Sequence, residues 1–207
     1  MSYRQDKDLE FLGKCDNEDL GELFKLLTYD PKDNLKRLTE TLFISDEFKQ
    51  YGHDYKKYWK RIAEELQLFG GNTISNVFRG GSGVLYREIL EDVARNQKIS
   101  FKKSNTTTHI EDKLVSKVME NYYDSLSKEE QRKFIDDLGE SGKDFKKIFS
   151  SDKFINNSMI NIITTTLVSI VFSPWILVYI ARPAMRITLP AVFLIAVLRK
   201  KIENNKN

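Results

Sequence analysis

The chain has 207 residues, of which 41% are hydrophobic and 30% charged, and its formal net charge at pH 7 is +3. This length suits one good-sized domain with an appendage and excludes two ordinary domains with a tail. A single cysteine, Cys15, excludes an intramolecular disulfide framework.

The positive charge lies at the C-terminal end. Residues 154–207 carry six Lys or Arg against one Glu, a net of +5, which leaves −2 for residues 1–153. Nucleic-acid binders carry their basic patch on a folded domain, so no nucleic-acid partner is expected. A basic tail is instead typical of segments that meet anionic lipid headgroups.

Residues 1–153 are predicted to form a soluble, all-α, multi-helix bundle. Apolar residues recur at helical spacing, Pro31 is the only proline before residue 174, and no sustained alternation indicates strands. Ser100–Thr108 is polar and is expected to be the longest loop. The predicted helices are, in chain order, Leu9 to about Cys15, Asp16 (as N-cap) to Thr28, a helix with Leu35, Leu38 and Leu42, a short helix capped by Ser45, Asp54–Phe69 closed by Gly70 and Gly71, Asn72–Phe78, Leu85 to about Gln97, His109–Leu126, Lys128–Leu138 behind a capping box of Ser127 and Glu130, and a basic helix around Phe145.

No motif in the chain indicates catalysis. His53 and His109 are far apart, and the one cysteine supplies no metal-ligand spacing. Acidic pairs such as Glu64-Glu65 are interpreted as solvent-exposed helix faces. We therefore expect a protein that is not an enzyme, with no catalytic residue, metal site or cofactor. An enzyme whose site assembles only in space is the least favoured alternative.

The glycine-rich stretch Gly70–Gly83 lacks the Lys-Ser/Thr pair of a phosphate-binding loop, and no strand precedes it. Its glycines are interpreted as helix ends. Arg79, Tyr86 and Arg87 flank the stretch and could contact an anion or a partner.

The tail, residues 154–207, is hydrophobic and flanked by basic residues. Phe154–Ala181 contains no charged residue, and Met159–Ile180 is long enough to span a membrane, with a kink expected at Pro174. Small and polar side chains fall on one side of this predicted helix, which favours packing against another membrane helix or a second copy. This stripe comprises Ser158, Asn161, Thr165, Ser169 and Ser173.

The second apolar run, Ile187–Leu198, has the length of a re-entrant, interfacial or buried segment. A single span would export every cation of the tail, against the positive-inside rule, whereas a hairpin returns Arg199, Lys200 and Lys201 to the inner face. The hairpin, however, puts Arg182 and Arg186 at the outer turn, and its second arm is short. An interfacial or re-entrant arm is a compromise between the two and is slightly preferred. No secretory signal is visible at the N-terminus, so the soluble domain is expected in the cytoplasm and the protein at the membrane. The alternative is a C-terminal hydrophobic hairpin wrapped by amphipathic helices, permanently or until a trigger releases it, which is the outline of colicin pore-forming domains.

Three segments resemble the YaaW family, a group of uncharacterised bacterial proteins. They are Leu85–Val93 after the glycine stretch, Asp8–Leu12 through Leu26-Leu27-Thr28, and Arg186–Val192 with Ile195-Ala196 and Leu198-Arg199. The resemblance implies an all-helical protein, loosely grouped with ubiquinol-cytochrome c chaperones that assist assembly of a membrane respiratory complex. It carries over no catalytic residue. Between about Ser150 and Ala184 the chain departs from the family, which is richer there in glycine and alanine.

Together these observations predict a non-enzymatic, membrane-associated helical protein, acting as an assembly factor, adaptor or chaperone-like protein at the inner face of the membrane. Its expected partners are membrane lipid and either another membrane helix or a second copy. The alternative is a conditional pore-forming or membrane-disrupting effector whose C-terminal hairpin inserts. Deletion from Ser158 onward is predicted to leave a soluble, folded remnant.

Overall fold

A computed structural model of the chain describes residues 3–30, 33–38, 40–73, 83–137 and 185–205. Within these ranges the protein is helical, with one isolated β-bridge between Tyr29 and Lys36, which confirms the predicted all-α class. The described elements are η1 (Glu10–Lys14), α1 (Asn17–Thr28), α2 (Asp46–Tyr51), η2 (Tyr55–Tyr58), α3 (Trp59–Thr73), α4 (Tyr86–Asn96), α5 (Thr107–Ser125), α6 (Lys128–Asp137) and α10 (Met185–Asn204), where η denotes a 3-10 helix.

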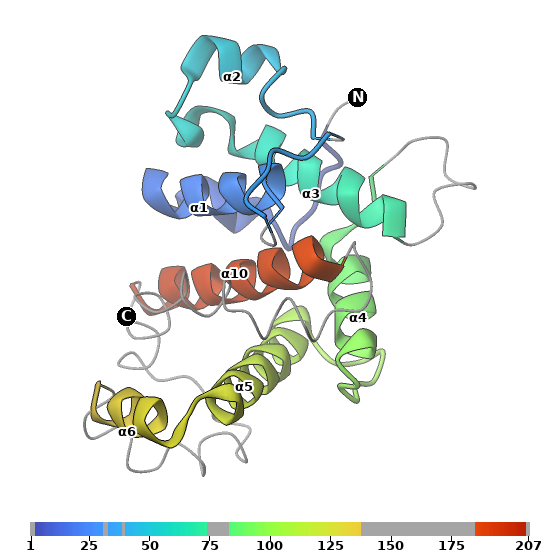
Figure 1. Ribbon diagram of the computed structural model, residues 1–207. Helices are drawn as coiled ribbons and strands as arrows, with labels where there is room; N and C mark the ends of the chain where they lie inside the picture. Colours follow the sequence, from blue (N-terminus) through green and yellow to red (C-terminus); the bar gives the residue numbers. More distant parts are fainter. Residues whose placement is uncertain (1–2, 31–32, 39, 74–82, 138–184, 206–207) are drawn as a thin grey trace.

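Helix α10 forms the centre of the described bundle. It contacts α1, α3, α4, α5 and η1, and Figure 1 shows it passing between α1 on one side and α5 on the other. Every residue from Ile187 to Leu198 is buried, and Phe193 has no exposed surface. A helix that is apolar on all sides is stable in water only where neighbours cover its whole circumference. The surrounding helices supply that cover.

Helix α10 lies beyond the predicted boundary at residue 153/154, yet it packs into the bundle formed by the helices before that boundary. Residues 187–198 were expected to be an interfacial or re-entrant arm of a tail, but they belong to the same hydrophobic core as α1, α4 and α5. The physical reason is that the apolar surfaces match. Each of those amphipathic helices has one apolar face to bury, and α10 is apolar on all sides and can pack against all of them at once.

Within the described residues, no helix combines the length and the apolar character that crossing a membrane requires.

The first apolar run, Phe154–Ala181, lies outside the described residues, as does the predicted stripe on it.

Several helix starts agree with the sequence prediction because their caps are local. The Asp16 carboxylate accepts a hydrogen bond from the Asp19 amide at 2.8 Å, and the Ser45 hydroxyl accepts one from Phe48 at the start of α2. At α6, Ser127 and Glu130 each accept a hydrogen bond from the other's backbone amide, as a capping box requires.

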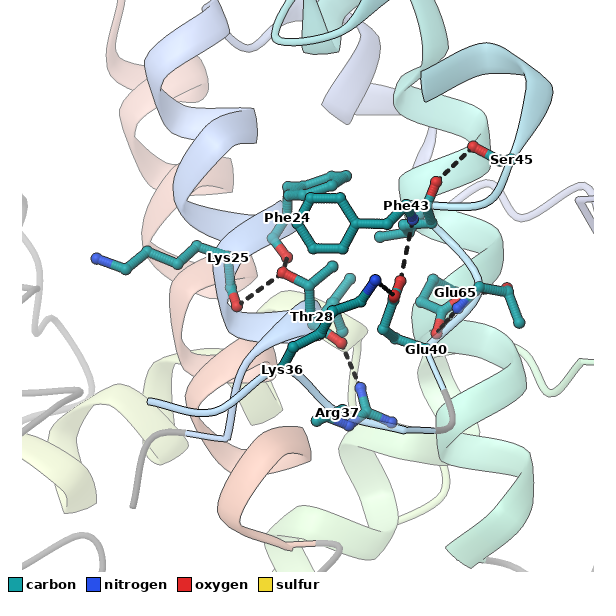
Figure 2. A network of polar contacts seen from close by, with 12 residues as sticks. Phe24, Lys25, Thr28, Lys36, Arg37, Glu40, Phe43, Ser45 and Glu65 are labelled. Atoms are coloured by element: carbon teal, nitrogen blue, oxygen red, sulfur yellow. Dashed lines mark hydrogen bonds and ion pairs between the residues drawn. The ribbon is translucent and has the colours of Figure 1, made fainter. Parts of the chain in front are cut away.

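The predicted helix containing Leu35, Leu38 and Leu42 is wrong. Residues 33–38 and 40–45 are not helical; Leu35 and Leu38 are 65% and 102% exposed, and Leu42 is the buried one of the three leucines. The helical spacing of the leucines does not decide the structure here, because the polar residues between them form contacts with other parts of the chain. Arg37 donates to the Leu27 carbonyl at the end of α1, and Lys36 pairs with Glu40 at 3.0 Å (Figure 2).

Two further predictions around α3 are corrected. The helix continues through Gly70 and Gly71 to Thr73, where the glycines were expected to end it. Glu64 and Glu65 are buried, although they were interpreted as a solvent-exposed pair. Glu65 accepts the Thr41 hydroxyl at 2.6 Å, and Arg61 lies 3.6 Å from each of the two carboxylates. Glu65 thus fixes Thr41 to α3.

Candidate functional site

A largely covered arginine near the end of α10, whose side chain is 12% exposed, joins segments that are far apart in the sequence. Arg199 Nε donates to Glu111 Oε2 of α5 at 2.8 Å, and its Nη2 donates to the Asp8 carbonyl at 2.6 Å. Its guanidinium also lies 4.3 Å from the centre of the Phe11 ring. We call the five residues Asp8, Phe11, Tyr86, Glu111 and Arg199 the Arg199 hub.

Tyr86 completes the hub from α4. Its hydroxyl donates to Glu111 Oε1 at 2.7 Å, and its side chain is fully buried. Burial raises the pKa of Glu111, although the bonds from Arg199 and Tyr86 oppose that rise. Burial alone would lower the pKa of Arg199, but the facing Glu111 carboxylate reverses this and raises it. The two charges are thus held inside the protein chiefly by each other.

The next two residues of α10 are also paired with the bundle. Lys200 lies 3.0 Å from Asp112 of α5, and Lys201 donates to Asp16 and Asp19 of α1 at 3.0 and 2.8 Å. The sequence suggested that the cations at 199–201 face anionic lipid at the inner membrane surface. In the structure all three face protein carboxylates, which bind the end of α10 to α1 and α5.

The segment before η1 carries two carboxylates, those of Asp6 and Asp8, which lie at the starts of α4 and α5. The N-cap residue of α4, Leu85, has no side chain that can accept a hydrogen bond from the helix. Asp6 Oδ2 takes its place and accepts a hydrogen bond from the Tyr86 backbone amide at 2.6 Å. Asp8 Oδ2 accepts the Thr107 hydroxyl at the start of α5, at 3.0 Å. A negative charge is favourable at a helix N-terminus because of the helix dipole. The segment therefore caps α4 across eighty positions of sequence.

Replacing Asp6 by Ala is expected to lower the free energy of unfolding by about 1–2 kcal/mol, the usual loss for a helix N-cap. Asp6→Asn keeps an oxygen acceptor and should recover most of that loss. Urea unfolding followed by circular dichroism measures both variants. Equal stability of Asp6→Ala and the wild type would show that α4 needs no cap from this segment.

A cleft of about 1040 Å³ lies beside the hub. Arg87 stands in its wall, where Nε donates to Glu91 and Nη1 to the Asn105 carbonyl, each at 2.8 Å. The start of α4, where an anion would bind most readily, already holds the carboxylate of Asp6. The lining comprises Gln5, Asp6, Lys7, Asp8, Glu10, Leu85, Arg87, Glu91, Lys103, Asn105, Thr106, Thr107 and Thr108.

Two of the three residues predicted to contact an anion or a partner, Tyr86 and Arg87, lie in the described part of the chain. Arg79 lies outside the described residues. Tyr86 is buried with its hydroxyl on Glu111, while Arg87, its neighbour on α4, lines the cleft and is paired. Of the two described residues, Arg87 is therefore the one that a ligand in the cleft could contact.

Sequence reasoning missed Glu111 and Arg199 as a pair. Their 88-residue separation gives no local signal, and Arg199 looked like one of three basic residues flanking an apolar run. The available signal lay in the resemblance: Asp8–Leu12, Leu85–Val93 and Leu198-Arg199 are parts of its three separate segments, and the hub contains residues from each of them.

Metal binding and thiol chemistry find no support in the described ranges. No group of three or more His, Cys, Asp or Glu in that part of the chain is placed to hold a metal ion. Cys15 is buried, and burial raises the pKa of its thiol to about 12, so the reactive thiolate is scarce at neutral pH.

Comparisons with known proteins agree with the resemblance found in the sequence. Residues 3–38, which include Asp6, Asp8 and Phe11, match the family model "Domain of unknown function (DUF3944)". A UPF0174 protein of Helicobacter pylori strain J99 is 34% identical over 98% of the chain and 94% of its own length. The UPF0174 protein YaaW of Escherichia coli K12 is 36% identical over 65% of the chain and 57% of its own length. No solved structure matches the chain.

Proposed function

The chain belongs to the UPF0174 family, the family of YaaW, and we propose that it is a non-enzymatic helical adaptor at the inner face of the membrane. In this proposal the bundle holds a neighbouring apolar segment, Phe154–Ala181, which meets lipid and a partner helix. The observation that carries the proposal is the fixed position of α10. It begins four residues after the apolar segment and is the core of the bundle.

Helix α10 is suited to anchor the segment Phe154–Ala181 to the bundle, but its uncharged run is too short to span a membrane in its place. Its uncharged run of twelve residues, Ile187–Leu198, is about 18 Å long at 1.5 Å per residue. The hydrocarbon layer of a membrane is about 30 Å thick. The 28 residues of Phe154–Ala181 exceed the roughly 20 that a spanning helix needs. The apolar segment is therefore the membrane-contacting part in this proposal, and α10 ties it to the bundle.

The contacts at the far end of α10 support this role as a tie. The ion pairs of Arg199, Lys200 and Lys201 with α5 and α1 oppose withdrawal of the helix along its axis. Binding of a partner to the apolar segment would thus act on the whole bundle through a buried helix. The proposed partner is a membrane helix or a second copy that packs on the stripe. Its residues are Ser158, Asn161, Thr165, Ser169 and Ser173.

A replacement of Phe154–Ala181 by a glycine–serine linker of equal length tests the proposal. The wild type is expected in the membrane fraction after an alkaline wash, and the replaced protein in the supernatant. Near-ultraviolet circular dichroism should remain that of a folded bundle, because α10 is retained. Release of the wild type by the alkaline wash would contradict the proposal.

A second candidate is a conditional pore-former, and the burial of an all-round apolar helix by amphipathic neighbours favours it. In this candidate a trigger frees the C-terminal region for insertion. High-level expression distinguishes the two, with a potential-sensitive dye as the readout. Collapse of the membrane potential supports the pore-former. An unchanged potential together with co-purified membrane proteins supports the adaptor.

A further inference from the structure

A second cleft, of about 570 Å³, lies against α1 and shares no residue with the Arg199 hub. Its volume falls in the range of small-molecule sites, which are usually concave, rich in aromatic side chains and provided with a few polar groups. Its lining comprises Asn17, Glu18, Gly21, Glu22, Phe24, Lys25, Tyr29, Asn34, Phe43, His53 and Tyr55.

The aromatic walls of this cleft hold one another in place. The Phe24 ring lies 5.1 Å from Phe43 and 5.0 Å from Tyr55, centre to centre, and Tyr29 lies 5.9 Å from Phe43. Figure 2 shows the Phe24 and Phe43 rings side by side. Rings packed edge to face and at tilted angles have little freedom to move. The walls are therefore arranged before any ligand arrives.

Two carboxylates in the lining have no partner in the described part of the chain. Glu18 and Glu22 are one helical turn apart on α1, so they lie on the same face, and neither forms a hydrogen bond or an ion pair there. Lys25 belongs to the lining as well, but its side chain points away from the Phe24 and Phe43 rings (Figure 2). The lining of the cleft thus combines aromatic rings with two acidic side chains of α1.

The faces of the aromatic rings, like the carboxylates, attract positively charged groups. An aromatic face carries partial negative charge and attracts an ammonium group within about 6 Å of its centre. One such contact exists already, because the Lys36 ammonium lies 4.5 Å from the centre of the Phe43 ring. Burial, and then the neighbouring Tyr29 and Glu22, raise the pKa of Tyr55, so its phenol stays protonated at neutral pH.

We propose that this cleft binds an organic ammonium cation of the choline or alkylamine type. The rings of Tyr29, Phe43 and Tyr55 enclose the methyl or methylene groups, and Glu22 balances the positive charge. A neutral ligand of the same shape would gain the apolar contact but not the attraction to rings and carboxylate. The inference is independent of the proposed adaptor role, because it uses no residue of the tail.

Choline and its neutral isostere 3,3-dimethylbutan-1-ol are the probes, titrated into the full-length protein in detergent and followed by NMR. Choline is expected to bind about 5- to 30-fold more tightly than the alcohol, as estimated for cation–ring and carboxylate attraction. Equal affinity for the two probes would mean a merely apolar cleft and overturn the proposal. Absence of choline binding would overturn it too.

Variants locate the binding. Glu22→Gln and Tyr29→Leu should each weaken choline binding about 3- to 10-fold, as expected for one ring or charge, while Glu129→Gln, an exposed acid on α6 outside the cleft, should not. Thermal melting of each variant confirms that it is folded. Unchanged choline affinity in both cleft variants would place the binding elsewhere and contradict the proposal.

The same cation could be a free amine or the headgroup of a lipid. Vesicles of phosphatidylcholine that displace choline would assign the cleft to a headgroup. Choline binding that such vesicles leave unchanged would assign it to a free amine. Either result supports ammonium recognition, because the vesicle experiment is interpreted only after the Glu22 and Tyr29 variants have placed choline in this cleft.

Discussion

Replacing Arg199 by Leu is expected to lower the free energy of unfolding by about 3–5 kcal/mol, because it leaves a buried carboxylate without its counter-ion. Glu111 is 1% exposed, and its other partner is the Tyr86 hydroxyl. Urea unfolding at pH 7 measures the loss. Arg95→Leu breaks an ion pair whose arginine is 62% exposed and should cost less than about 1 kcal/mol.

The loss in Arg199→Leu should shrink as the pH is lowered. Burial raises the pKa of Glu111 in the folded protein, and removal of Arg199 takes away the main charge that opposes the rise. A group whose pKa is raised by folding favours the folded state below its unfolded pKa, and this stabilisation is lost as the pH rises through the folded pKa. The variant should therefore be closest to the wild type in acid and furthest from it at neutral pH and above.

The double variant Arg199→Leu with Glu111→Leu separates charge from packing. If the unpaired carboxylate causes the loss, removal of both charges should restore much of the stability, since apolar pairs often replace buried ion pairs with little loss. A double variant that is as unstable as the sum of the single variants would show that the hub acts through shape alone.

Residues 1–137 alone are expected not to fold, whereas the same residues joined to residues 185–205 by a long glycine–serine linker should fold. Helix α10 buries nine large apolar side chains, each worth about 1.5–3 kcal/mol when covered. Their sum matches or exceeds the whole stability of a typical domain, about 5–15 kcal/mol. Without α10, the apolar faces of α1, α4 and α5 would meet water.

Size-exclusion chromatography and near-ultraviolet circular dichroism distinguish the two chains. Neither chain contains the apolar run 154–181, so aggregation of either chain cannot come from that run. This expectation reverses the one drawn from sequence, that deletion from Ser158 onward leaves a folded remnant. A cooperative unfolding transition in residues 1–137 alone would restore the original expectation.

Sequence patterns located helices well where a helix is specified by its own residues. The caps Asp16, Ser45 and Ser127 sit at the starts they were predicted to mark. The pattern failed at Leu35, Leu38 and Leu42, whose spacing is helical although the segment is a loop. There Arg37 and Thr41 bind the end of α1 and the side of α3, and a helix would break those bonds.

The sequence by itself determined the all-helical class, the family and the two apolar runs near the C-terminus. It could not decide what covers Ile187–Leu198, since lipid and the apolar faces of other helices are equally dry surroundings for such a run. The same holds for Arg199, Lys200 and Lys201, because a basic cluster attracts lipid phosphates and protein carboxylates alike. Only the tertiary structure showed that α1 and α5 bring those carboxylates to the end of α10.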